Sequence, residues 1–177
     1  MSLRRLLPVA ATAATAVVLL LGRAVAGTQD AAVGGLPELV AAAERICEVE
    51  VLEAVSARLD DGTIETRYSL RTLTPIKGVA ASVQELRMPG GEVAGRGLVV
   101  PGVPRFAPGE RTVLFLTRAT EGKAWRLPVG LERGTMRVLP GAQPRVLVQR
   151  AHDAAPEVVD RDTFVAEVLD EVARQRR

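Results

Sequence analysis

Short segments in which apolar and polar residues alternate recur along this 177-residue chain, and glycine and proline separate them. In one of these segments Cys47, Val49 and Val51 alternate with Glu48 and Glu50, which is the period of a strand with one buried face. The expected strands are 46–55, 64–74, 83–88, 98–100, 113–117, 125–131, 135–139 and 145–148. Strands at such spacing, with no helices alternating between them, predict a mainly β protein, a small antiparallel OB-like barrel.

The strands differ in how much of each face they are expected to bury. Segment 113–117 is strongly apolar, which predicts a central strand covered on both sides. Acidic side chains on the other strands are expected to face solvent, with no special role. They are Glu48, Glu50, Glu53, Glu65, Glu85 and Glu92.

Two helices are expected at the ends of the folded part. Residues 36–44 have a proline at their second position and place Leu39 and Val40 on one face, which predicts a short N-terminal helix. In the last segment apolar residues recur at helical spacing from Phe164 onward, which predicts a C-terminal amphipathic helix with Asp160 or Asp162 as its N-cap.

The first 26 residues have the pattern of an export signal. Arg4 and Arg5 precede an uncharged apolar run, and Ala24-Val25-Ala26 offers a cleavage site before Gly27. The alternative is an uncleaved membrane anchor. The expected organisation is a signal peptide at 1–26, a short leader at 27–37, a barrel at 38–150, and a linker with the C-terminal helix at 151–177. The mature protein is then secreted or periplasmic.

Charge and composition exclude several partners. Three of the 23 basic residues and none of the 21 acidic residues lie in the signal, so the mature chain is almost neutral. A neutral chain with 3% aromatic residues lacks the basic surface and the stacking rings of a nucleic-acid-binding protein. Contact with a membrane is expected only through an uncleaved signal.

Catalytic and metal-binding patterns are sparse. Cys47 is the only cysteine and is expected to be a buried apolar residue; a reactive thiol is the alternative. His152 is the only histidine, and one histidine with one cysteine is too few for an ordinary zinc site. No cofactor, metal site or catalytic group is therefore predicted.

A longer pattern resembles a family of uncharacterised secreted bacterial proteins. It joins the glycine-rich passage 88–95 to 104–111, which reads P-x-F-x-P-G-E-R, and to the apolar strand 113–116. Gly130 and the triplet Met136-Arg137-Val138 complete it. The strand order is also similar to the netrin-like barrel of the tissue inhibitors of metalloproteinases. That second resemblance implies an OB-like fold but not zinc chelation, since an N-terminal cysteine is missing.

The function expected is non-catalytic binding of a secreted or envelope protein, which could be a protease. Binding residues tend to lie in loops on a rigid scaffold, so the candidate surface is the glycine- and proline-rich loop region. Its residues are Glu92, Arg96, Arg105, Phe106 and Glu110. Phe106 could equally be a buried residue that fills the core of the barrel. The alternatives are a secreted hydrolase that uses His152 and an envelope structural protein.

Overall fold

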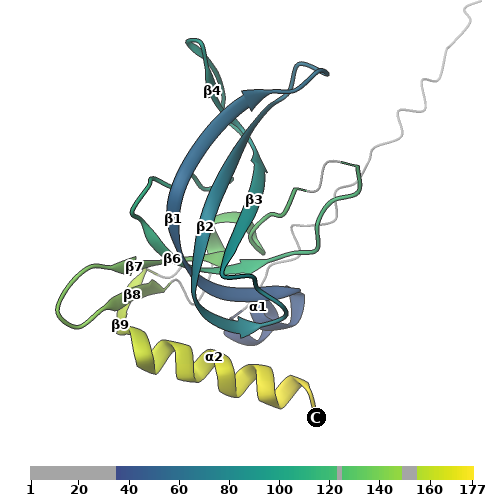
Figure 1. The fold of residues 1–177 in the computed structure, drawn as a ribbon. Helices are drawn as coiled ribbons and strands as arrows, with labels where there is room; N and C mark the ends of the chain where they lie inside the picture. The colour runs from purple at the N-terminus through teal and green to yellow at the C-terminus, as the bar shows by residue number, and fades with distance from the viewer. Residues whose placement is uncertain (1–34, 123–124, 149–154) are drawn as a thin grey trace, which may run out of the picture.

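The computed structural model describes residues 35–122, 125–148 and 155–177. The predicted mainly β class is confirmed, because one antiparallel sheet holds seven strands in the order β3-β2-β1-β6-β7-β8-β9. These strands are β1 (Arg45–Arg58), β2 (Ile64–Lys77), β3 (Val83–Pro89), β6 (Arg111–Leu116), β7 (Thr135–Leu139), β8 (Arg145–Val148) and β9 (Glu157–Asp160). The small hairpin of β4 (Gly91–Val93) and β5 (Arg96–Leu98) stands apart from this sheet (Figure 1).

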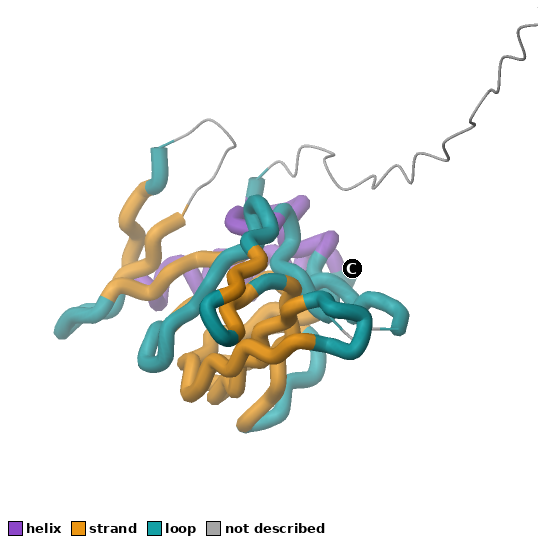
Figure 2. The backbone as a smooth tube through the Cα atoms, turned by 90° about the horizontal axis from the view of Figure 1, so that it is seen from above, coloured by secondary structure: helices purple, strands orange, loops and turns teal. Residues whose placement is uncertain are grey.

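The two longest strands bend the sheet. β1 and β2 have 14 residues each, and their pairing contains three register shifts. Such bulges increase twist and bend a strand pair. The curvature separates the sheet into two parts, and Figure 2 shows β7, β8 and β9 extending to one side of the other strands.

β6 lies in the middle of the sheet with apolar packing on both faces, as its sequence predicts. Val113 and Phe115 belong to one core cluster, and Leu114 and Leu116 belong to the other. Alternate residues of a strand point to opposite faces, so a strand between two cores must be apolar at every position.

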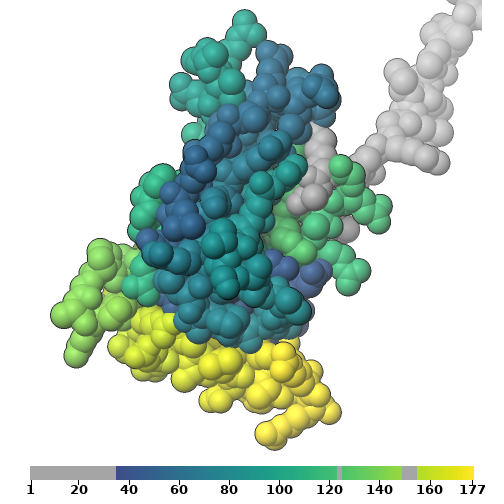
Figure 3. Space-filling view, viewed as in Figure 1, coloured from purple at the N-terminus to yellow at the C-terminus, as the bar shows by residue number. Residues whose placement is uncertain are grey.

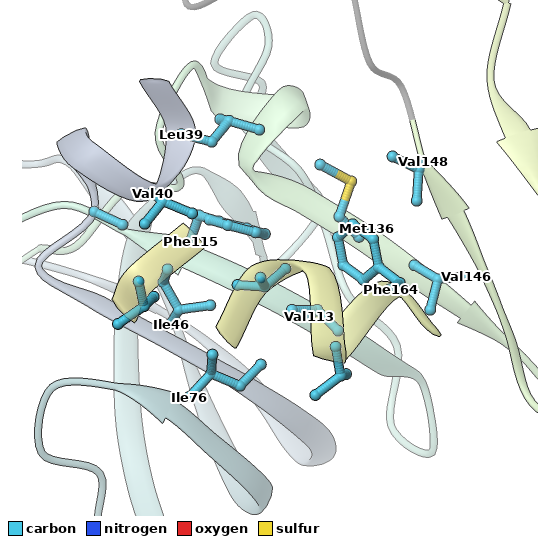
Figure 4. Packing of buried hydrophobic residues seen from close by; sticks show 14 of the residues in the cluster. Leu39, Val40, Ile46, Ile76, Val113, Phe115, Met136, Val146, Val148 and Phe164 are labelled. Carbon is cyan, nitrogen blue, oxygen red and sulfur yellow. The ribbon is translucent and has the colours of Figure 1, made fainter. Parts of the chain in front are cut away.

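Helices α1 (Leu36–Ala42) and α2 (Arg161–Gln175) pack on the first of these cores. Figure 4 shows Val40 of α1 and Phe164 of α2 lying with Phe115 and Met136 of the sheet. Asp160 is the N-cap of α2, and its carboxylate accepts a hydrogen bond of 2.9 Å from the backbone N–H of Thr163. Both predicted helices are therefore confirmed. The described part of 151–177 also adds β9 to the sheet.

The second core is enclosed by β1, β2, β3, β6 and a loop. Phe106 from this loop is buried against Tyr68 of β2, with their ring centroids 5.3 Å apart in an edge-on arrangement. Leu127 packs on the same cluster. The loop region thus covers the side of the core that the strands leave open.

The closed barrel expected from the strand count is not present among the described strands. β3 and β9 are sheet edges, each paired with one neighbour only. A backbone hydrogen bond of 3.2 Å from Arg126 N–H to the Arg87 carbonyl links β3 to the segment after β6. One such bond is not a strand ladder, and the sheet remains open there.

Three local predictions are corrected. The strand expected at 98–100 lies earlier, as β5 at Arg96–Leu98. Residues 125–131 do not form a strand, because Pro128 makes only an isolated bridge and Gly130 and Leu131 have positive φ values of 60° and 57°. The chain then enters a short 3-10 helix, η1 (Leu131–Gly134). Glu48 and Glu65 are also buried instead of facing solvent, at 0% and 1% relative exposure.

Candidate functional site

Three open hollows lie next to one another over β6, β7 and the start of α2. The first, of about 340 Å³, and the second, of about 530 Å³, share Arg137. The second and the third, of about 450 Å³, share Arg111 and Pro144. We call the three together the arginine groove. Figure 3 shows the β7–β8 loop projecting beside the start of α2 at this side of the molecule.

The middle of the groove forms where β7 changes partners. β7 pairs with β6 up to Arg137, which lies opposite Thr112. From Val138 onward it pairs with β8 instead. The strand therefore leaves β6 at this point, and the side chains of Arg111 and Arg137 line the hollow between the two strands.

Glu110 holds Arg137 in the groove. One carboxylate oxygen of Glu110 accepts a hydrogen bond of 2.7 Å from Arg137 Nε, and the other accepts one of 3.0 Å from the backbone N–H of Ala107. Arg137 is 60% exposed. Its two terminal amino groups have no partner among the described residues, so they remain available as donors in a fixed direction.

Glu48 anchors the other end of the groove. Its buried carboxylate accepts hydrogen bonds from Arg111 Nη2 (2.6 Å), Arg161 Nε (2.9 Å) and Arg161 Nη2. Thr74 completes the set, at 3.3 Å from Glu48 and 2.6 Å from Arg161. A buried carboxylate is tolerated only when it is paired and hydrogen-bonded in this way.

The Glu48 cluster joins three elements that are distant in the sequence. Glu48 belongs to β1, Arg111 to β6 and Arg161 to the first turn of α2. Burial by itself would lower the pKa of Arg161, but the hydrogen bonds that Arg161 donates to Asp162 and Glu48 raise it above its ordinary value. Arg161 is therefore charged at any physiological pH, and the cluster fixes the start of α2 against the sheet.

A second buried carboxylate, Glu65, lies outside the groove. It accepts hydrogen bonds from Trp125 Nε1 (2.9 Å) and Arg67 Nε (2.8 Å). Burial would raise the pKa of Glu65, but these hydrogen bonds and the charges of Arg67 and Arg87 lower it. Glu65 thus remains ionised, and it fastens the Trp125 segment to the outer face of β2.

The five residues predicted as one binding surface lie in three places. Arg105 and Glu110 line the groove, in hollows that meet at Arg137. Glu92 and Arg96 are exposed on the β4–β5 hairpin, where Arg96 lines a separate hollow. Phe106 lies in the core.

Sequence reasoning missed the roles of Arg111, Arg137 and Arg161. Two of them stand inside the sequence pattern already noted, because Arg111 ends P-x-F-x-P-G-E-R and Arg137 is the centre of Met136-Arg137-Val138. Their spacing along the chain gave no reason to place Arg111 and Arg137 together. The pairing of β6 with β7 brings these two residues close to each other.

Cys47, one of the two residues considered for chemistry, does not line the groove. Cys47 is buried in the second core, and burial raises the pKa of its thiol. The interpretation of Cys47 as a buried apolar residue is confirmed. His152 lies outside the described residues, as does the predicted signal at 1–26.

In the part of the chain that the structure describes, no cluster of three or more His, Cys, Asp or Glu residues is placed to bind a metal ion. In the same residues, no helix has the length and apolar character needed to cross a membrane.

Comparison with known protein families, curated proteins and solved structures finds no match to this chain. The resemblances noted in the sequence stay predictions.

Proposed function

We propose that this chain is an exported, non-catalytic module that binds a protein partner in the cell envelope or outside the cell, with the arginine groove as its contact surface. The observation that carries the proposal is that three neighbouring hollows adjoin one another at shared residues, Arg137 between the first two and Arg111 and Pro144 between the second and third. Each of the three hollows is open to solvent. Small-molecule sites usually enclose most of the ligand surface, whereas an open groove suits a segment of a macromolecule.

The groove also has the rigidity that a recognition surface needs. Arg111 is held by Glu48, Arg137 by Glu110, and the start of α2 by the Glu48–Arg161 pair. Side chains that are already oriented lose less conformational entropy when a partner binds. Arginine is, moreover, one of the residue types that most often dominate the binding energy of interfaces.

For the fold, we propose that the part made of β1, β2, β3 and β6 is an OB-like barrel that has opened between β3 and the segment after β6. Two contacts support this view. Arg126 N–H bonds the Arg87 carbonyl of β3, and Pro128 bridges Leu116 of β6. Amide hydrogen exchange tests it: a protected Arg126 amide supports the relation, and an unprotected one contradicts it.

Affinity capture with three proteins tests the function. The bait is the chain from Gly27 onward as wild type, as the groove variant Arg105→Ala/Arg137→Ala, and as the hairpin variant Arg96→Ala. The proposal expects one protein of the same identity to be captured by wild type and by Arg96→Ala and to be lost with the groove variant. Circular dichroism and thermal unfolding establish that each bait is folded.

Two outcomes would overturn the proposal. If the groove variant captures the partner as well as wild type does, the groove is not the contact surface. If Arg96→Ala alone abolishes capture, the β4–β5 hairpin is the surface instead. Mass spectrometry of the exported chain gives a separate test of export, because processing before Gly27 is expected.

A further inference from the structure

The centre of the arginine groove carries a local excess of positive charge. Among the described residues, the two hollows that meet at Arg137 are lined by four arginines and two glutamates, whereas the third hollow is lined by two arginines, two glutamates and one aspartate. Over the whole chain the ratio of basic to acidic residues is nearly even, at 23 to 21. A surface whose charge differs from that of the rest of the chain favours partners of the opposite sign.

Three arginines of this surface, Arg105, Arg111 and Arg137, are oriented by hydrogen bonds but keep further N–H donors that have no partner among the described residues. Arg137 engages Glu110 through Nε only, Arg105 donates from Nη2 to the Leu98 carbonyl at 3.1 Å, and Arg111 donates from Nη2 to Glu48. No other partner of these three side chains is found among the described residues. Each guanidinium thus keeps amino groups that can donate to a ligand.

Guanidinium groups favour one ligand chemistry in particular. Their planar, paired N–H donors match the two oxygens of a carboxylate, and such charge-assisted hydrogen bonds are stronger than neutral ones. Arg105 and Arg137 line one hollow, and Arg111 and Arg137 line the next. A ligand with carboxylates at intervals could therefore engage more than one arginine.

We infer that the two hollows of the arginine groove that meet at Arg137 recognise an acidic segment of the protein partner, rich in aspartate or glutamate, whose carboxylates pair with Arg105, Arg111 and Arg137. This inference rests on the proposed function, since it names the chemistry of the partner at that same groove. The pairs would be at the surface, so each contributes modestly and their strength falls as salt rises.

Two synthetic dodecapeptides test the inference. One alternates glutamate with serine, and its matched control alternates glutamine with serine. Fluorescence anisotropy would measure the binding of each to wild type, to Arg137→Ala and to Arg118→Ala. Arg118 is the matched control position, because its substitution removes the same charge from a side chain that is 89% exposed, outside the groove and paired with Glu44.

The acidic peptide is expected to bind at least fivefold more tightly than the glutamine peptide at low salt, with affinity falling as salt is added. Arg137→Ala is expected to weaken its binding about fivefold, which corresponds to about 1 kcal/mol for one exposed charge pair. Arg118→Ala should leave binding unchanged. Equal binding of the two peptides, or equal loss with both variants, would overturn the inference.

Comparing peptide binding with capture of the protein partner distinguishes a failure of this inference from a failure of the proposed function. If a protein partner is captured through the groove but the acidic peptide does not bind, the acidic chemistry is wrong and the binding function stands. If neither binds, both fail. An acidic polysaccharide such as polygalacturonate is titrated in parallel, and binding of this polymer without binding of the peptide would refute a protein segment as the ligand.

Discussion

Replacing Glu48 by glutamine tests whether the Glu48 cluster holds α2 against the sheet. The substitution keeps the size of the side chain but removes the charge that pairs with Arg111 and Arg161, and it replaces an acceptor oxygen with a donor NH2 group. Breaking one partner of a fully buried ion pair costs about 3–5 kcal/mol. Because the arginine side chains are 39% and 20% exposed, solvent compensates part of that loss, and we expect about 2–3 kcal/mol.

Urea denaturation followed by circular dichroism measures this cost directly. In a domain of this size the expected loss lowers the melting temperature by about 8 °C. Glu50→Gln is the matched control, because Glu50 lies on the same strand, pairs with Arg71 and is itself 26% exposed. That control should cost less than about 1 kcal/mol.

A double-mutant cycle with Arg161→Gln separates the pair from its surroundings. The two substitutions should not be additive, since residues in one hydrogen-bond network typically show coupling of about 0.5–3 kcal/mol. If Glu48→Gln costs no more than Glu50→Gln, the burial and pairing assigned to Glu48 are wrong. Additive losses in the cycle would mean that Arg161 does not depend on Glu48.

Three further predictions concern other parts of the fold. Gly91→Ala should destabilise the protein by more than about 2 kcal/mol in urea denaturation, because Gly91 has φ +136° and the new Cβ would lie 2.3 Å from Ser56 Oγ and 2.5 Å from Thr66 Oγ1; a neutral result would contradict the close approach. The pKa of Glu65 is lowered from 4.5 in the fold, so its contribution to stability is complete above that pH and is lost as the pH falls through the folded value. Acid titration of the free energy of unfolding should therefore show a shallower slope in Glu65→Gln than in wild type, and identical slopes would refute the assignment. Cys47 should not react with a thiol reagent in the native state but should react fully in urea, because burial raises its pKa and blocks access; rapid labelling of the native protein would show that the thiol is exposed.

The elements were predictable wherever a local pattern decided them. Residues 113–116 of the expected strand 113–117 are all apolar, and they lie in the central strand of the sheet between the two cores. Asp160 was one of two candidate N-caps, and it caps α2. Residues 125–131 show the limit of such patterns, since they alternate like a strand but contain Pro128 and Gly130, and the backbone turns there instead.

The candidate site was predictable only in part. Arg105 and Glu110 were chosen because they lie in a glycine- and proline-rich loop, and both line the groove. Glu92 and Arg96 were chosen for the same reason, but they lie on the separate β4–β5 hairpin, outside the groove. Phe106 belongs to the same loop and fills the core, because an aromatic ring next to an open sheet face gains more from burial than from exposure.

The amino-acid sequence by itself determined most of the stretches that become strands and helices, because alternation, helical spacing, capping and turn residues act over a few neighbouring positions. Only the tertiary structure decided that the sheet stays open and that Glu48 is buried. It also decided that Arg105, Arg111 and Arg137 line one groove. The physical reason is distance along the chain: the partner that covers Glu48 is Arg161, 113 residues away, and Arg137 reaches Glu110 across 27 residues. Contacts of that kind depend on how the strands pair and pack, which no local pattern of residues specifies.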